Sequence, residues 1–413
     1  MGLRNPAAAA PHVALIVDST FGYGRAIVAG IAQYVREHGP WSLYFEPRNL
    51  ANEIPIWLHR WKGNGIIARL QTSALAEALV RTKVPVVDTV GDFSPKGVAA
   101  VHCDDAAIGR MAADHFLQRA FRSFACCTYR FDADDHLVQD MKKHGHDSSP
   151  PDGRVWSRQR CEAMIARVEK LGYPCSVHSL PSRTATGSAW EREQNLLSNW
   201  IGRLPKPTGI FATNDNLGRR VLEACRRIDM AVPDQIAVVG VDNDEVLCQV
   251  CDPPLSSVVA DHHRVGYEAA RLLDELMQGN PVPESSLKIA PRGVVARVSS
   301  DVLALEDADV SLAVREIREH ACEGIDVGEV ARRVGLSRTT LKRRFRAALN
   351  RSVQEEIAAV QLKRVQQLLA ETELPLKAIA RQTGFRHASS LAAAFKLLTG
   401  MTPGEYRLQA HGS

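Results

Sequence analysis

The sequence contains no hydrophobic run that approaches the roughly 20 residues of a membrane-spanning helix. Its first residues, Met1 to Pro11, are rich in alanine, are interrupted by two prolines and carry a single arginine. Such a segment is too short and too broken for a secretory signal peptide. We therefore expect a cytoplasmic protein with no membrane partner, in which residues 1–10 form a disordered stub.

Cysteine is present, but not in the pattern of a disulfide framework. The nine cysteines are scattered between Cys103 and Cys322, and an odd number leaves one without a partner. Cys248 and Cys251 form one isolated Cys-x-x-Cys, which is a weak redox or metal signal. This pattern is typical of a reducing compartment and predicts neither a metal site nor a cofactor.

Signatures of catalysis are also lacking. No nucleophile, histidine and carboxylate stand in a recognisable catalytic arrangement, and no glycine-rich phosphate loop is present. We therefore expect that the protein is not an enzyme.

The last hundred residues carry the strongest pattern in the chain. Asp326 and Glu329 stand in the spacing of a capping box and predict that a helix begins there. Gly335 permits a sharp turn after this helix, and Ser337 can cap the next one. The apolar positions of both helices recur at helical period: Val327, Val330, Ala331, Val334, Leu341 and Phe345.

The opposite face of the second of these helices is cationic. A helix with an apolar back and a cationic, hydrogen-bonding front is typical of a recognition helix in the major groove of DNA. We predict that this first helix-turn-helix contacts double-stranded DNA through Ser337, Arg338, Thr339, Lys342, Arg343 and Arg346.

A second helix-turn-helix repeats the layout, with its turn at Gly384 and Phe385 and its second helix over Ser389–Leu398. A final helix begins at Thr402–Glu405, which combines a capping box with a proline at the first helical position. Between the two units, Val353–Ala370 predicts one helix of about 18 residues, roughly 27 Å long. A rod of that length can hold two recognition helices about one DNA turn apart, ~34 Å.

Charge is distributed unevenly along the chain. From residue 310 onward there are 17 Lys and Arg against 10 Asp and Glu, which gives a net charge of +7. The preceding 309 residues hold 34 and 37, a net charge of −3. A basic domain behind a mildly acidic body is what a phosphate-binding partner such as DNA requires.

The body of about 300 residues alternates short apolar strands with amphipathic helices. Predicted strands are His12–Val17, Gly65–Ala68, Val84–Asp88, Ser123–Thr128, Gly209–Ala212 and Ile236–Val241, and helices include Tyr23–Glu37, Ala106–Ala120 and Leu217–Ile228. This alternation predicts parallel sheets built from βαβ units, with a ligand site beyond the carboxyl ends of the strands.

Polar residues follow four of the predicted strands. They are Asp18, Tyr23 and Arg25, then Asp88 and Asp92, then Asn214 and Asp215, and finally Asp242, Asn243, Asp244 and Glu245. Each residue alone is explained by a helix cap or a solvated loop. Together they predict a small polar ligand, because carboxylates, amides and arginine bind vicinal hydroxyls and an aromatic ring covers the apolar face of a sugar.

The carboxyl-terminal pattern resembles a known family. Gly384-Phe385, Phe395-Lys396, Gly400, Thr402-Pro403 and Tyr406-Arg407 are similar to the signature of the arabinose-regulator (AraC) family of transcription factors. One departure concerns the second recognition helix, which presents Ser390-Leu391-Ala392-Ala393-Ala394 where the family usually has a long polar side chain. We therefore expect the first unit to supply most base readout. The second would mainly contact the DNA backbone, through Arg386, His387, Ser389 and Lys396.

The body resembles the sugar-sensing core of the lactose-repressor (LacI) family. The resemblance rests on Val101-His102-Cys103-Asp104-Asp105, Phe211-Ala212-Thr213-Asn214-Asp215 and Val238-Val239-Gly240-Val241-Asp242. A LacI-like sensor followed by an AraC-type domain is the arrangement of the xylose operon regulator family. It implies a two-lobed α/β sensor of the periplasmic-binding-protein type at 11–300, a linker at 301–310, an all-α domain with two helix-turn-helix motifs at 311–408 and a tail at 409–413.

The resemblance also implies ligand contacts. Arg160 matches an arginine that grips sugar hydroxyls, Asn214 and Asp242 match polar contacts from the second lobe, and Trp190 matches an aromatic wall of the cleft. Asp18, Tyr23 and Arg25 would contribute from the first lobe. A lone tryptophan on a helix is also typical of a core position.

One segment departs from the family pattern. Residues 131–156 form a long polar stretch that is rich in turn formers and includes several histidines and aspartates, among them His136, His144 and His146. It is interpreted as a disordered insertion, because no compact ligand spacing appears. The alternative is a metal-binding lid.

Two other functional classes share part of this pattern. A transport binding protein shares the two-lobed fold but needs an export signal and carries no DNA module. A DNA-alkylation repair enzyme fused to an AraC-type domain needs a reactive cysteine near the amino terminus, whereas the first cysteine is Cys103.

We therefore expect a transcriptional activator of sugar catabolic genes that binds D-xylose or another pentose, forms a homodimer and contacts RNA polymerase. The alternatives left open are a different sugar or polar ligand, and repression instead of activation.

Overall fold

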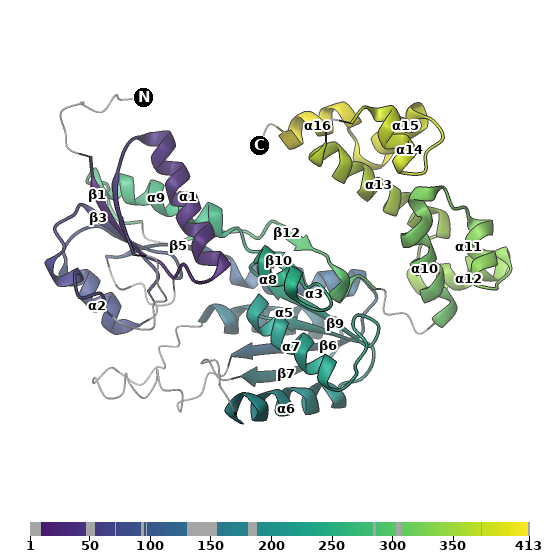
Figure 1. The fold of residues 1–413 in the computed structure, drawn as a ribbon, viewed down its shortest axis with the longest axis horizontal. Helices are drawn as coiled ribbons and strands as arrows, with labels where there is room; N and C mark the ends of the chain where they lie inside the picture. The colour runs from purple at the N-terminus through teal and green to yellow at the C-terminus, as the bar shows by residue number, and fades with distance from the viewer. Residues whose placement is uncertain are drawn as a thin grey trace. The chain divides into compact units, whose positions relative to one another are not determined.

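The structure is a computed structural model that describes residues 10–46, 54–70, 72–91, 95, 97–129, 155–180, 188–283, 286–302, 307–372 and 374–411. The chain divides into two compact units, residues 1–301 and residues 302–413. The first unit is built from parallel sheets with helices, and the second is entirely helical (Figure 1). The predicted fold class is confirmed.

The first lobe of the first unit is a six-stranded sheet in the order β11-β5-β4-β3-β1-β2. Its strands are β1 (His12–Ile16), β2 (Ser42–Phe45), β3 (Gly65–Ala68), β4 (Val86–Asp88), β5 (Ala99–Cys103) and β11 (Leu287–Ile289), and every neighbouring pair is parallel. The accompanying helices are α1 (Gly22–His38), η1 (Leu58–Arg60), α2 (Ser73–Arg81) and α9 (His262–Met277). Helices α1 and α9 pack side by side (Figure 1).

The second lobe is a six-stranded sheet in the order β12-β10-β9-β8-β6-β7. Its strands are β6 (Ser123–Tyr129), β7 (Cys175–Leu180), β8 (Thr208–Ala212), β9 (Ile236–Val241), β10 (Ser256–Val259) and β12 (Gly293–Val295), and only the β10–β12 pair is antiparallel. Its helices are α3 (Asp105–Gln118), α5 (Val155–Glu169), α6 (Ser188–Arg203), α7 (Asp215–Arg227), α8 (Glu245–Val250) and η2 (Val298–Ser300).

The chain passes between the lobes three times. It leaves β5 for α3, which packs on α5, returns from β10 to α9, and finally runs from β11 to β12. The three crossings are hydrogen-bonded to one another: Asp104 N donates to Ile289 O at 2.8 Å, and Arg292 N donates to Val259 O at 2.9 Å. The crossings therefore form one connected hinge at the mouth of both sheets.

The second unit contains α10 (Ala308–His320), η3 (Ala321–Glu323), α11 (Val327–Arg333), α12 (Arg338–Leu349), α13 (Val353–Glu371), α14 (Leu376–Gln382), α15 (Ala388–Thr399) and α16 (Pro403–His411). It has two apolar clusters. The first holds Leu341 and Phe345 of α12, and the second holds Leu391 and Phe395 of α15. Helix α13 serves both, with Ile357 in the first cluster and Leu368 in the second.

Local signals in the second unit are confirmed with one correction. Ser337 caps α12, and Gly335 and Gly384 adopt positive φ at the two turns, of +70° and +76°. Thr402 and Glu405 bond reciprocally to each other's backbone, as a capping box does. Asp326 caps α11, but the Glu329 side chain pairs with Arg332 and Arg333. The capping box predicted there is therefore only half formed.

Several predicted features fall outside the described residues. They are Asp92, residues 131–154 of the polar insertion and residues 303–306 of the linker. Among the helices that are described, none is long and apolar enough to cross a membrane.

Candidate functional site

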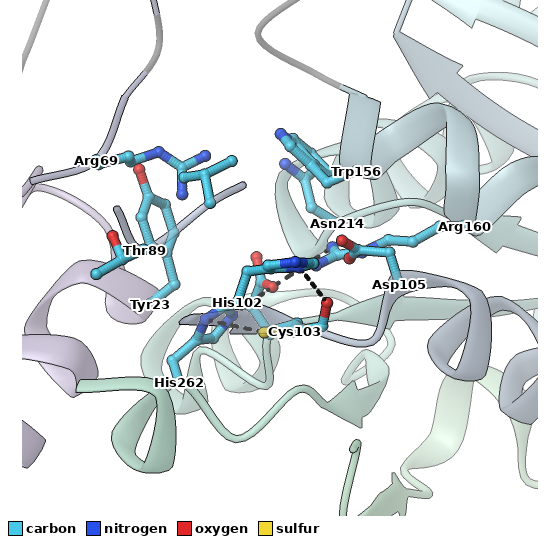
Figure 2. Close-up of a pocket in the computed structure, with 12 residues that line it drawn as sticks. Tyr23, Arg69, Thr89, His102, Cys103, Asp105, Trp156, Arg160, Asn214 and His262 are labelled. Carbon is cyan, nitrogen blue, oxygen red and sulfur yellow. Dashed lines mark hydrogen bonds and ion pairs between the residues drawn. The ribbon is translucent and has the colours of Figure 1, made fainter. Parts of the chain in front are cut away.

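An open cavity lies between the two lobes of the first unit, and its empty space, including the solvent at its mouth, is about 410 Å³. It is lined by Tyr23, Arg69, Thr89, Val90, His102, Cys103, Asp105, Trp156, Arg160, Asn214, Asp242 and His262. Tyr23, Arg69 and Thr89 face it from one side, and Trp156, Asn214 and Arg160 face it from the other (Figure 2). Most of these residues follow the carboxyl ends of parallel strands, where α/β sheets bind ligands.

Arg160 on α5 is the most constrained cation of the cavity. Its side chain is buried, Nε donates to Asp105 Oδ1 at 2.7 Å, and Nη1 donates to the Thr213 carbonyl at 2.8 Å. Nη1 also lies 3.6 Å from Asp242 Oδ1. These bonds fix the guanidinium plane, so little side-chain entropy is lost when Arg160 binds a ligand.

Asp242, directly after β9, is the central carboxylate. It accepts a hydrogen bond from His262 Nε2 at 3.0 Å. Burial alone would raise the pKa of Asp242, but this hydrogen bond and the charges of His262 and Arg160 lower it below the ordinary value. Asp242 is therefore ionised at neutral pH and presents acceptor oxygens to the cavity.

Asp215 behaves differently, although it belongs to the same lobe. It is buried at the start of α7, where it accepts hydrogen bonds from Ser257 Oγ at 2.6 Å and from Asp244 N at 2.8 Å. Burial and the nearby charge of Asp242 raise the pKa of Asp215 to about 8. At neutral pH Asp242 is therefore charged, whereas Asp215 is protonated.

Two aromatic rings bound the cavity, and each is covered by an arginine. The Arg69 guanidinium lies 4.5 Å from the centre of the Tyr23 ring, and the Arg160 guanidinium lies 4.7 Å from the Trp156 ring. Burial raises the pKa of Tyr23 to about 12, so its hydroxyl remains a donor. Hydroxyl groups and the apolar faces of a sugar both find partners in such a cavity.

Four of the seven predicted ligand residues come together here: Tyr23, Arg160, Asn214 and Asp242. Asn214 also caps α7, with Oδ1 accepting from Leu217 N at 2.9 Å.

The other three do not line the cavity. Asp18 is buried and accepts from Thr20 N at 2.9 Å. Arg25 donates to the Ser19 and Thr20 carbonyls, at 3.1 and 2.8 Å, and lies 3.5 Å from Asp244. Both therefore shape the turn that carries Tyr23.

Trp190 lies elsewhere. Its ring stands 5.5 Å from the guanidinium of Arg227, between α6 and α7, whereas Trp156 is the tryptophan that lines this cavity. The sequence could not make this distinction, because both tryptophans begin helices of the second lobe.

The sequence did not predict the other eight lining residues, which are Arg69, Thr89, Val90, His102, Cys103, Asp105, Trp156 and His262. A signal was available for several of them. Arg69 and Thr89 directly follow the predicted strands Gly65–Ala68 and Val84–Asp88. His102, Cys103 and Asp105 lie in the family motif at Val101–Asp105. Asp242 was predicted because it is a polar residue that directly follows a strand. The same rule also applies to Arg69.

The second unit presents the predicted DNA-contacting residues at its surface. Leu341 and Phe345 anchor α12, while Ser337, Arg338, Thr339, Lys342, Arg343 and Arg346 are exposed. Among the ion pairs of the described residues, none involves Arg338, Lys342 or Arg343; Arg346 lies 3.6 Å from Glu355. The front of α12 is therefore cationic and largely uncompensated.

The corresponding residues of the second helix-turn-helix are also exposed. They are Arg386, His387, Ser389 and Lys396. Between them, α15 exposes Ser390 and Ala393, whose short side chains reach little of a base edge.

Comparison with known proteins gives the same two parts. Residues 12–99 match a family model described as the XylR N-terminal domain, residues 113–300 match a periplasmic binding protein-like domain, and residues 330–409 match a helix-turn-helix domain. The xylose operon regulatory protein of Haemophilus influenzae is 30% identical over 402 residues, which is 96% of this chain and 98% of that protein.

The chain belongs to the family of xylose operon regulatory proteins. The Escherichia coli K12 member is 28% identical over 403 residues, 96% of each chain. A solved structure of the xylose-binding transcription activator XylR superposes with a TM-score of 0.59 at 27% identity and covers 97% of this chain and 98% of its own. The predicted family and the predicted class, a helix-turn-helix transcriptional regulator with a sugar-sensor domain, are thereby confirmed.

Proposed function

We propose that this regulator binds D-xylose in the cavity between the lobes of its first unit and, in response, activates transcription of sugar catabolic genes. The observation that carries the proposal is the cavity itself, where Arg160 and Asp242 are held rigid between two aromatic rings. The names of the relatives, which are xylose operon regulatory proteins and a xylose-binding activator, support D-xylose as the sugar.

Each lining group has a chemical role in this proposal. Asp242 accepts hydrogen bonds from adjacent hydroxyls, and Arg160 and Asn214 donate to ring and hydroxyl oxygens. Trp156 and Tyr23 cover the apolar C–H faces of the sugar. A hydrogen-bonding site of this kind discriminates strongly, because an analogue without a hydroxyl leaves a buried polar group unpaired.

Sugar binding controls the activity of the protein by changing the arrangement of the two lobes. A ligand that contacts Tyr23 on one lobe and Asp242 on the other has a higher affinity for the closed arrangement, and it shifts the population toward that arrangement. The protein acts as a homodimer in this proposal, and lobe closure changes how its two DNA-binding units engage DNA.

The DNA-binding unit reads base edges mainly with α12, through Arg338, Lys342 and Arg343. The second helix-turn-helix contributes phosphate contacts. As an activator, the bound protein contacts RNA polymerase, and its site of action is the cytoplasm, where the DNA lies.

Calorimetric titration of the full chain against D-xylose, L-arabinose, D-ribose and D-glucose tests the effector. We expect saturable binding of D-xylose, and weaker or no binding of the other three. Asp242→Asn is the matched variant, since asparagine tolerates the positive φ of 102° at this position while losing the charge. It should lose the sugar response but bind DNA as the wild type does without sugar. Binding of another sugar in preference to D-xylose would overturn the assignment of the effector.

A further inference from the structure

Three residues of the cavity form a chain of contacts that the binding of a neutral sugar does not require. Cys103 Sγ lies 3.6 Å from His262 Nδ1, and His262 Nε2 lies 3.0 Å from Asp242 Oδ1. Figure 2 shows the sulfur of Cys103 beside the His262 ring, joined by a dashed line. Cys103 ends β5, Asp242 follows β9 and His262 begins α9, so the fold assembles the chain from three distant segments.

This order of groups is the one that activates a cysteine. An imidazole held on one nitrogen by a carboxylate keeps its other nitrogen directed at the sulfur, so that the proton of the thiol can be held on the ring. A thiolate is the reactive form of cysteine, and a positively charged neighbour stabilises it.

The electrostatics of His262 agree with this arrangement. Burial lowers the pKa of His262, but the charge on the Cys103 sulfur and the hydrogen bond to Asp242 outweigh it and raise the pKa to about 10. The other ionisable groups that line the cavity are Arg69, Arg160, Asp105, His102 and Tyr23. Arg160 adds a second fixed positive charge, while Asp105 is already paired with Arg160 at 2.7 Å.

Other cysteines of the chain are in a different environment. Burial raises the pKa of Cys127, Cys175 and Cys225 to about 12 in each case, so these thiols stay protonated. In the hydrogen bonds of the described residues, only Cys103 has a histidine as partner. Cys175, which is partly exposed, is therefore a natural internal reference.

We propose that Cys103 is an oxidation site inside the effector cavity, where a small hydroperoxide converts its thiol to a sulfenic acid. The cavity admits a molecule as small as hydrogen peroxide to a residue that is only 7% exposed. In the reaction the thiolate sulfur attacks one peroxide oxygen, an S–O bond forms and the O–O bond breaks. The sulfur is oxidised by two electrons, and the departing hydroxide takes the proton held on His262 and leaves as water.

Oxidation at this position would interfere with the sugar. The added oxygen lies against His262 and Asp242, the carboxylate that accepts hydrogen bonds from the ligand. The Cys103 thiol also donates a hydrogen bond to the Ala260 carbonyl oxygen at 3.2 Å, which joins two of the three crossings between the lobes. This bond is lost when the thiol gives up its proton. The modified protein should therefore bind the effector weakly, and bound effector should shield the sulfur. This second half rests on the proposed function, whereas the reactivity of Cys103 does not.

The test treats the full chain with hydrogen peroxide in the presence of dimedone, which traps sulfenic acids, and follows each cysteine by peptide mass spectrometry. We expect Cys103 to be labelled at least about tenfold faster than Cys175 at pH 7. His262→Gln should slow Cys103 labelling by about tenfold and leave Cys175 unchanged. Tryptophan fluorescence checks that the variant is folded.

Labelling of Cys103 no faster than that of Cys175 would overturn the proposal. So would a folded His262→Gln protein that reacts at the wild-type rate. D-xylose at saturation should slow the labelling, and peroxide should weaken D-xylose binding by the wild type while leaving that of Cys103→Ser as it was before treatment. Rapid labelling of Cys103 that D-xylose does not slow would support the oxidation site and contradict D-xylose as the ligand of this cavity.

Discussion

Asp244 Oδ2 accepts a hydrogen bond from the backbone N–H of Gly22, 222 residues away, at 3.0 Å. Gly22 begins α1 in the first lobe, and Asp244 precedes α8 in the second, so the contact ties the lobes together beside the cavity. The carboxylate lies at the positive end of a 17-residue helix, which strengthens the interaction. Arg25 lies 3.5 Å from the same oxygen, but its side chain is half exposed and adds little.

Removing this contact should weaken sugar binding without removing the cavity. We expect Asp244→Asn to raise the Kd for D-xylose about threefold to tenfold, because the closed arrangement loses roughly 1 kcal/mol relative to the open one. Calorimetry measures the affinity, and small-angle scattering without sugar should report a more open first unit. Asparagine can still cap α8, where Asp244 Oδ1 accepts from Leu247 N. An unchanged Kd would show that this contact does not bias closure.

Two of the three tryptophans of the second lobe, Trp156 and Trp190, provide a matched pair of substitutions. Trp156→Leu removes the ring that lies against Arg160 and should weaken D-xylose binding about tenfold or more. Trp190→Leu removes a ring that contacts Arg227 outside the cavity and should change the affinity less than about twofold. Titrations of both variants measure the difference. A larger loss of affinity in Trp190→Leu than in Trp156→Leu would support the sequence prediction that Trp190 is the aromatic wall of the cleft.

The stability of the first unit should depend on pH through Asp215. Its pKa is about 8 in the folded protein, whereas in the unfolded chain it is near the ordinary value of about 3.9. Between these values only the folded state holds the proton, so stability is greatest at low pH and falls as the pH rises toward 8. The slope is at most about 1.4 kcal/mol per pH unit.

Urea unfolding between about pH 5 and pH 6 tests this effect, because His262 is then largely protonated in both states. Burial also raises the pKa of Asp105, so the contribution of Asp215 is the difference between the wild type and Asp215→Asn. All six tryptophans lie in the first unit, so their fluorescence follows that unit alone. Asp215→Asn should flatten the pH dependence in this window. A slope equal to that of the wild type would mean that Asp215 is ionised in the folded protein.

Substitution of Arg343 tests directly whether α12 contacts the bases of DNA. Arg343→Ala should cost about 1–3 kcal/mol on the cognate site and reduce the preference for it over scrambled DNA. Arg332→Ala removes the same charge from α11, where Arg332 pairs with Glu329, and should affect both DNAs alike. Fluorescence anisotropy at fixed salt measures both ratios. An unchanged preference in Arg343→Ala would remove α12 from base readout.

The sequence predicted central strands better than edge strands. Gly65–Ala68 and Ile236–Val241 were predicted to the residue, since strands buried on both faces are continuous apolar runs. The edge strands β2, β7, β11 and β12 were missed, and so were the interior strands β5 and β10. These segments are short, and most of them mix polar and apolar residues, as Ala99–Cys103 and Ser256–Val259 do. Edge strands carry weak periodic signals for this physical reason.

For the site, the rule that polar residues follow strands found Asn214 and Asp242. It could not find the pairing of Cys103 with His262, which are 159 residues apart and meet only because the chain crosses between the lobes at both positions. Nor could it separate Trp156 from Trp190. That choice depends on which turn of a helix faces the cavity, and packing between helices decides it.

Helix α13 fixes the spacing of the DNA segments that the second unit can contact. Because this single helix supplies Ile357 to one apolar cluster and Leu368 to the other, neither half of the second unit can detach without exposing its own core. A 19-residue helix spans roughly 28 Å, and it sets a fixed distance between the two halves of the second unit. The operator should therefore contain two contacted segments at one fixed helical phase, and five inserted base pairs between them should turn one segment away from the protein.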